Sequence, residues 1–262
     1  MLTLSLIGIG CGDPEQLTLA AIRAINAADL VLIPRKGADK SDLAELRRTI
    51  CAQVVTGSKP RLVEFDLPLR DACGEDYRGG VDTWHDAVAT AWSREIAAHL
   101  GGEGRVALLI WGDPSLYDSS LRIARRLDPV PEIEVIPGVT SIQALCAAHA
   151  LPLNDIGAPF LVTTGRRLRE GGWPPGVDTV VVMLDGGAAF QSLDPRGLRI
   201  WWGAYLGMPD QIIMAGPLAE VSAQIVEIRR EARDKHGWIM DSYILKREFV
   251  VSDDRQGKTH AS

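Results

Sequence analysis

Three times within the first 141 residues, a short apolar run passes directly into a turn that contains glycine. These segments read LSLIGIGCGDP at 4–14, ALLIWGDP at 107–114 and EVIPGVTS at 134–141. A short, continuous apolar run that ends in turn residues is typical of a strand buried in a parallel sheet. The carboxyl ends of parallel strands share one edge of the sheet, and open α/β sheets bind ligands at that edge. The pattern therefore predicts an α/β fold in which the three glycine turns meet at a ligand-binding edge.

The remaining periodicities predict the other elements. In the first half, strands are expected at 2–10, 29–34, 61–68, 105–114 and 132–138. In the second half, strands are expected at 160–164, 178–184, 199–205, 211–216 and 241–248. Helical spacing predicts helices at 18–28, 42–55, 84–100, 141–150 and 218–236, with a loop at 70–82. Several strands of the second half are joined by short loops, which favours antiparallel pairing.

This distribution predicts two α/β domains. An N-terminal domain with a parallel sheet, helices and the glycine-rich loop is expected at 1–138, and a C-terminal domain with a mixed sheet at 139–251. The polar segment 252–262 is expected to be a flexible tail. The active-site cleft is expected between the two domains.

Composition excludes several classes of protein. The formal net charge of −6 disfavours a nucleic-acid binder, which needs a basic surface. Four cysteines without C-x-x-C spacing indicate reduced thiols and a cytoplasmic protein, and the scattered histidines argue against a metal site. No stretch approaches the roughly 18 apolar residues that a membrane span requires, so no membrane association is expected.

The first glycine turn does not match a dinucleotide loop well. Gly8 and Gly10 fit the first two positions of G-x-G-x-x-G, but Asp13 occupies the third and would repel a diphosphate. The second strand ends without the acid that binds a ribose hydroxyl, although Arg35 and Lys36 could accept a 2′-phosphate. An NADP-dependent oxidoreductase therefore stays an alternative. Because no lysine or arginine lies in the three turns, their backbone groups suit an adenosine and an amino-acid moiety better than a phosphate chain.

Together, the three turns resemble those of the S-adenosylmethionine-dependent tetrapyrrole methyltransferases. GIGCGDPEQLT at 8–18 is similar to the family's G-x-G-P-G-D-P-x-x-L-T, with Cys11 in place of the usual proline. The Gly-Asp-Pro turn at 112–114 and the PGVTS turn at 137–141 resemble two further family turns. At 180–187, VVVMLDGG stands where the family often has Tyr-Met-Gly. The likeness runs from residue 2 to about residue 250 and implies the class III, tetrapyrrole methylase-like fold.

The resemblance implies S-adenosylmethionine as the methyl donor and no metal. By position, the residues implied to line the cofactor site are Cys11, Trp111, Gly112, Asp113, Leu116, Thr140, Ser141, Leu184 and Gly216. Helix capping is the alternative role for Thr140 and Ser141, and a place in the core is the alternative for Leu116 and Leu184.

Three further stretches, LAELRRTICAQV at 43–54, VDTWHDAVATAWSREI at 81–96 and WWGAYLGMPDQIIMAG at 201–216, resemble the members of this family that act on precorrin-5. This resemblance implies methylation at C-1 of precorrin-5 with loss of acetate. Asp13 and Asp113 are the acids best placed to orient the substrate or accept a proton, with helix capping as the alternative. Residue type alone makes His85 and Tyr117 candidates for acetate release, as it does Asp185 and Tyr205. Another precorrin C-methyltransferase and a non-catalytic ligand carrier are further alternatives, and the family implies a homodimer.

Basic residues are expected to hold the carboxylates of such a substrate, because the protein itself is acidic. The candidates are Arg35, Lys36, Arg166 and Arg167. Three other arginines, Arg47, Arg48 and Arg169, are expected on solvated surfaces.

Overall fold

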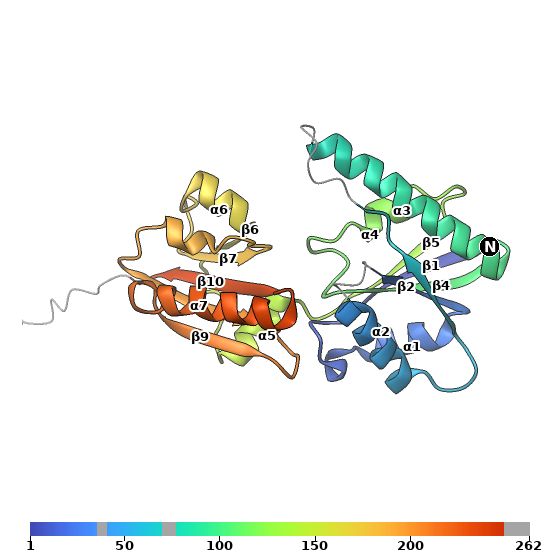
Figure 1. Ribbon diagram of the computed structural model, residues 1–262, viewed down its shortest axis with the longest axis horizontal. Helices are drawn as coiled ribbons and strands as arrows, with labels where there is room; N and C mark the ends of the chain where they lie inside the picture. Colours follow the sequence, from blue (N-terminus) through green and yellow to red (C-terminus); the bar gives the residue numbers. More distant parts are fainter. Residues whose placement is uncertain (36–40, 70–76, 249–262) are drawn as a thin grey trace, which may run out of the picture. The chain divides into compact units, whose positions relative to one another are not determined.

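The computed structural model describes residues 1–35, 41–69 and 77–248 (Figure 1). The predictions for Lys36 and for the tail at 252–262 lie outside the described residues. The chain divides into two compact units, Met1–Ala144 with Tyr205–Asp210, and Leu145–Ala204 with Gln211–Ser262. Each unit holds one five-stranded sheet, so the predicted pair of α/β domains is confirmed. We expected the domain boundary between residues 138 and 139. The two units divide between Ala144 and Leu145, inside helix α5 (Ser141–Ala148).

The sheet of the first unit is entirely parallel, as the apolar runs predicted. Its strand order is β3-β2-β4-β1-β5. The strands are β1 (Leu2–Gly8), β2 (Leu30–Arg35), β3 (Arg61–Asp66), β4 (Gly104–Ile110) and β5 (Glu132–Ile136). Helices cover both faces, which is why the central strands are apolar on both sides.

Alternate residues of β1 enter two separate cores. Leu4 and Leu6 belong to one core, together with Trp92, whereas Ile7, and Ile9 just beyond the strand, belong to another core, together with Ile25. The covering helices are α1 (Leu19–Ala27), α2 (Ser41–Val54), α3 (Tyr77–Leu100) and α4 (Ser120–Ala124). Figure 1 shows α1 and α2 on one side of this sheet and α3 and α4 on the other.

The start of α3 corrects one prediction. The loop expected at 70–82 is wrong for Tyr77–Asp82, which is helical. Arg126, beyond the end of α4, donates to Asp82 through Nη2 and to Asp86 through Nη1, both at 2.6 Å. These contacts between distant segments hold the first turns of α3, and no local pattern could reveal them.

The second sheet is mixed, also as predicted. Its order is β6-β7-β10-β8-β9, and only the β6–β7 pairing is parallel within it. The strands are β6 (Phe160–Thr164), β7 (Thr179–Met183), β8 (Leu198–Ala204), β9 (Ile212–Pro217) and β10 (Asp241–Arg247). Helix α7 (Leu218–His236) packs against β8 and β9.

Helix α6 (Gly165–Gly171) was not predicted, because it spans only seven residues and ends in Gly171-Gly172. Its N-cap is Thr164, whose hydroxyl accepts a hydrogen bond from the backbone N–H of Arg167. The described residues also include two 3-10 helices, η1 (Pro14–Gln16) and η3 (Ala189–Ser192).

Within the described ranges, none of the helices combines the length and apolar character that crossing a membrane requires. The same residues contain no group of three or more His, Cys, Asp or Glu side chains that could hold a metal ion.

Candidate functional site

The three glycine turns meet at the carboxyl edge of the first sheet. Gly112 donates its N–H to the carbonyl of Gly10 at 2.8 Å, and Gly10 donates to the carbonyl of Gly112 at 3.3 Å. A Cβ atom placed on Gly138 would lie 2.2 Å from the Gly112 oxygen and 2.7 Å from the carbonyl carbon of Gly8. Such close approach of backbone to backbone leaves room only for glycine.

Asp113 joins the second turn to the third. Its Oδ2 accepts a hydrogen bond from the N–H of Gly138 at 2.9 Å, and its Oδ1 accepts one from the N–H of Ser115 at 2.8 Å. Burial raises the pKa of Asp113, but the hydrogen bonds from Ser115 and Gly138 outweigh it and hold that pKa below its usual value. A carboxylate that is ionised at neutral pH therefore lies where the turns meet.

The first turn is held by its own side chains and by the segment Tyr205–Asp210. Asp13 caps η1 by accepting a hydrogen bond from the N–H of Glu15 at 2.9 Å, so its capping role is realised. A Cβ atom on Gly12 would lie 2.4 Å from Cγ of Met208. Met208 thus packs directly on this turn, a contact that no sequence pattern indicates.

Cys11 fills the position that proline takes in the family loop. Its side chain is buried, with Sγ 3.6 Å from the carbonyl oxygen of Val139 in the third turn. Burial raises the pKa of the Cys11 thiol to about 12, so the thiol stays protonated at neutral pH. It acts as a small packing group between two turns.

The structure brings the other first-unit candidates to the same edge. Trp111 and Leu116 are half-buried, and Tyr117 is 46% exposed with a φ of 51°. Thr140 accepts a hydrogen bond from the N–H of Ile142 at 3.2 Å, which realises its alternative role as a cap of α5. Ser141, the first residue of α5, is half-buried.

The two second-unit candidates differ from each other. Leu184 follows β7 and is 65% exposed with a φ of 52°, so a core role is wrong for it. A large apolar side chain that stands out at a strained backbone position suggests a ligand contact. Gly216 is buried in β9, where a Cβ atom would lie 2.7 Å from Cγ1 of Val221 on α7.

Comparison with known proteins identifies the family. The family described as Tetrapyrrole (Corrin/Porphyrin) Methylases matches residues 3–222. The chain belongs to the tetrapyrrole methylase family. A tetrapyrrole methylase of this kind is an S-adenosylmethionine-dependent methyltransferase, so an NADP-dependent oxidoreductase and a non-catalytic carrier are set aside.

Individual relatives agree with this assignment. The chain is 50% identical over 246 residues to "Precorrin-6A synthase [deacetylating]" of Sinorhizobium, covering 92% of this chain and 94% of that protein. A solved cobalamin synthesis related protein from Corynebacterium diphtheriae is 37% identical with a TM-score of 0.80, over 95% of this chain and 100% of that one. The uroporphyrin-III C-methyltransferase of Thermus thermophilus, solved with S-adenosylhomocysteine, is 25% identical with a TM-score of 0.58, over 93% and 97% of the two chains.

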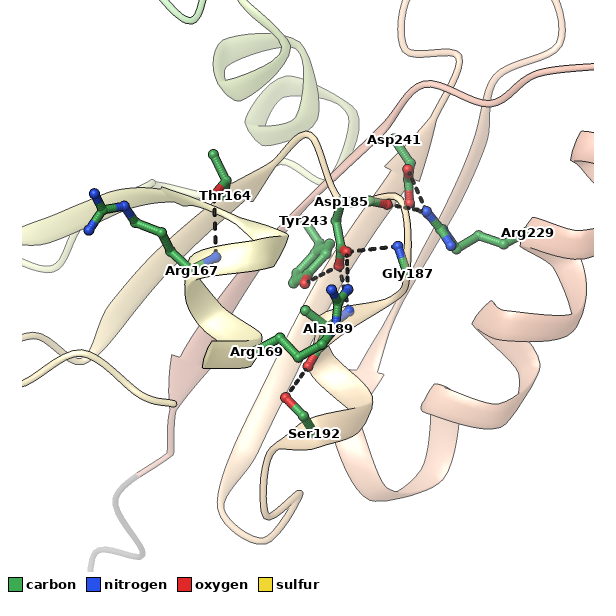
Figure 2. Close-up of polar contacts among 10 residues, drawn as sticks. All are labelled: Thr164, Arg167, Arg169, Asp185, Gly187, Ala189, Ser192, Arg229, Asp241 and Tyr243. Carbon is green, nitrogen blue, oxygen red and sulfur yellow. Dashed lines mark hydrogen bonds and ion pairs between the residues drawn. The ribbon is translucent and has the colours of Figure 1, made fainter. Parts of the chain in front are cut away.

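In this tetrapyrrole methylase, Asp185 anchors the turn that follows Leu184 (Figure 2). Its buried carboxylate accepts hydrogen bonds from the backbone N–H groups of Gly187 at 3.0 Å and Ala189 at 2.6 Å. Tyr243 donates its hydroxyl at 2.7 Å, and Arg169 donates from 3.3 Å. Because donors surround both oxygens, Asp185 is a structural acceptor and not a free base for acetate release.

A buried ion pair between Arg229 and Asp241 also contacts the backbone of this turn. Arg229 donates through Nε to Asp241 at 2.7 Å, and its Nη2 donates to the backbone carbonyl of Asp185. Asp241 also accepts a hydrogen bond from Nε1 of Trp202 at 2.8 Å. Although burial lowers the pKa of Arg229, its contacts with Asp241 raise that pKa above the usual value.

The predicted basic residues have different surroundings. Arg35 pairs with Asp66 at 3.0 Å, so part of its charge is already neutralised. Arg166 and Arg167 line an open pocket of about 590 Å³ in the second unit. The pocket is also lined by Leu161, Thr163, Leu168, Glu170 and Pro174.

Two surface assignments need correction. Arg169 is half exposed but reaches Asp185, so it is not purely solvated. The prediction is wrong for Arg47, which is half-buried and donates through Nε to the carbonyl of Leu109 at 2.9 Å. Its helical neighbours give a signal that could have revealed this: Leu43, Ala44, Ile50 and Cys51, at i−4, i−3, i+3 and i+4, are all apolar. Arg48 matches its prediction better, since it pairs with Glu45 and Glu64 towards solvent.

His85 is 3% exposed on α3, and neither of its ring nitrogens has a hydrogen-bond partner in the described chain. Its ring lies 5.6 Å from that of Trp84. Burial and the nearby Arg126 lower the pKa of His85 below 6.5. The surroundings are those of a neutral core histidine.

This burial predicts a pH-dependent stability. Above pH 7 both the folded and the unfolded chain hold His85 neutral, so it contributes no pH dependence. As the pH falls through 6.5, the unfolded chain binds a proton that the folded chain resists, and the free energy of unfolding decreases. We expect His85→Leu to flatten the decrease between pH 7 and pH 5 in urea denaturation. Equal slopes in His85→Leu and wild type would contradict the assignment.

Proposed function

We propose that this protein is a precorrin-6A synthase, which methylates C-1 of precorrin-5 and releases acetate. The observation that carries the proposal is the 50% identity, over nearly the whole of both chains, to the Sinorhizobium protein of that name. The three glycine turns also support the proposal, because they carry the residues that resemble the family's motifs and they meet at one edge of the sheet.

The residues at this edge fit S-adenosylmethionine, which when bound supplies a methyl group on a positively charged sulfur. The ionised Asp113 favours a cation nearby, and no lysine or arginine lies in the three turns to oppose it. Backbone N–H and C=O groups of the turns can bind the adenosine and amino-acid parts. We assign the cofactor contacts to Cys11, Trp111, Gly112, Asp113, Leu116, Thr140 and Ser141 of the first unit and to Leu184 and Gly216 of the second.

In this proposal the protein acts mainly by position. Methyl transfer to carbon is an in-line displacement, and holding both partners at reacting distance supplies much of the rate. No covalent protein nucleophile is needed. Asp113 binds the N–H of Gly138 and so orients the second turn relative to the third. The close backbone contacts of Gly112 with Gly10 and Gly138 keep the three turns in this arrangement.

Acetate release consumes one water, whose oxygen bonds to the acetyl carbonyl carbon. The bond from that carbon to the macrocycle breaks, its electron pair stays on the macrocycle, and the protons of the water pass to solvent. Among the named candidates, Asp185 is occupied by its donors, His85 is enclosed in the core and Tyr205 is buried. Tyr117, which is exposed on the loop after the second glycine turn, remains the candidate that could orient this water.

Arg166 and Arg167 are proposed to bind carboxylates of the tetrapyrrole, with Arg35 as a further contact. Their pocket is lined by these two arginines, by apolar residues and by one carboxylate, Glu170, so positive charge is in excess where a macrocycle with acidic side chains would bind. We also propose a cytoplasmic homodimer on the likeness to the family. The apolar strand β8 is no support for a dimer, because Ile200 and Trp202 lie in the core.

Incubation with precorrin-5 and methyl-labelled S-adenosylmethionine tests the function. One labelled methyl group and one acetate per turnover are expected. Labelled product without acetate would indicate another precorrin methyltransferase, and light scattering of the purified protein would test the dimer.

A further inference from the structure

Arg47 occupies an unusual place on α2, within the segment that covers one face of the first sheet. Its Nε donates to the carbonyl of Leu109 at 2.9 Å, and its Nη1 donates to the carbonyl of Leu43 at 3.0 Å. Both partners are backbone carbonyls, so the guanidinium is held in place without a carboxylate.

The strand geometry explains why an arginine fits there. The ladder between β2 and β4 ends at the pair Leu32–Leu108, and Pro34 has no N–H with which to extend it. The carbonyl of Leu109 therefore receives no donor from β2, and Arg47 supplies one. Two residues after Leu109, the chain enters the second glycine turn at Trp111, so the guanidinium lies at the carboxyl edge of the sheet.

The charge of Arg47 has no direct counterpart among the described residues. Among the residues whose side chains the structure describes, none places a carboxylate within ion-pair distance of Arg47, whereas Arg35 pairs with Asp66 and Arg48 with Glu64. Asp118 acts on Arg47 through its charge and raises the pKa of Arg47, while its Oδ1 accepts a hydrogen bond from the N–H of Ser120. Burial lowers the pKa of Arg47 to about 10, which shows that its surroundings penalise the charged form.

We propose that Arg47 binds a carboxylate of a ligand at this edge of the sheet, in addition to the arginines assigned above. Nη2 makes no hydrogen bond to a described residue, and a guanidinium with a free nitrogen can donate to a carboxylate in a fixed geometry. The inference rests on the proposed function, which offers two sources of that group: the acidic side chains of the tetrapyrrole and the carboxylate of the cofactor's methionine moiety.

Ligand binding by variants of the full-length protein distinguishes these sources. Arg47→Gln keeps a donor for the Leu109 carbonyl but removes the charge. We expect it to weaken binding of one ligand by roughly 10- to 100-fold, the range of a charge-assisted hydrogen bond. The probes are S-adenosylhomocysteine, measured by calorimetry, and uroporphyrin, a stable octacarboxylic porphyrin, measured by fluorescence in saturating S-adenosylhomocysteine. Loss confined to uroporphyrin indicates the tetrapyrrole, and loss confined to S-adenosylhomocysteine indicates the cofactor.

Arg48→Gln is the matched control, because it makes the same change of charge one residue away and should alter both affinities less than twofold. Arg47→Lys keeps the charge but not the planar geometry, and we expect an intermediate loss; it decides the outcome if Arg47→Gln does not fold. Folded variants at position 47 that bind both probes as tightly as wild type would overturn the inference. Wild-type protein that binds neither probe would instead overturn the proposed function.

Discussion

Replacing Gly138 with alanine is expected to weaken S-adenosylhomocysteine binding by at least about tenfold and to lower the free energy of unfolding by about 2 kcal/mol. The added methyl group would lie 2.2 Å from the Gly112 oxygen, so the second and third turns must move apart. That movement would also stretch the hydrogen bond from Gly138 to Asp113. Calorimetry and urea denaturation measure the two effects.

Gly171→Ala is the control for this substitution. Its added methyl group meets no atom within 4 Å, and the residue lies at the end of α6 without a positive φ. We expect wild-type cofactor affinity. If Gly138→Ala also bound S-adenosylhomocysteine like the wild type, contact between the turns would not matter for the cofactor.

The second large effect is expected from Arg229→Met, with a loss of about 3–5 kcal/mol in the free energy of unfolding. The side chains of Arg229 and Asp241 are only 9% and 5% exposed, so removal of the arginine leaves a buried carboxylate without its counter-ion. The carbonyl of Asp185 loses a donor at the same time. Chemical denaturation followed by circular dichroism measures the loss.

A neighbouring residue provides the comparison. Arg230→Met removes an exposed pair with Glu227, and its denaturation midpoint should match that of the wild type. Adding Asp241→Asn to Arg229→Met should recover part of the loss, because the unpaired charge disappears with it. Strictly additive losses would show that the two side chains do not act as a pair.

Local pattern alone was enough to predict most elements and the meeting of the glycine turns. Apolar runs and helical spacing are properties of a few neighbouring residues, and α7 falls at its predicted bounds of 218–236. The polarity of parallel strands then places every strand-to-helix turn at one edge, so Gly10, Gly112 and Gly138 had to converge. The family followed from the same turns, since their residues carry the motif.

Only the tertiary structure decided which charged groups are buried and what they contact. The charge of Arg47 suggested a solvated helix face, yet the carbonyl that Pro34 leaves unbonded on β4 draws it inward. Asp185 was a candidate base by residue type until its four donors, contributed by α6, β10 and its own turn, made it an anchor. Met208 reaches the first glycine turn from a segment nearly two hundred residues along the chain. The periodicity of a sequence indicates which face of a helix or strand is apolar. Whether a charged side chain is desolvated and paired depends on residues distant in the sequence, which become its neighbours only in the folded chain.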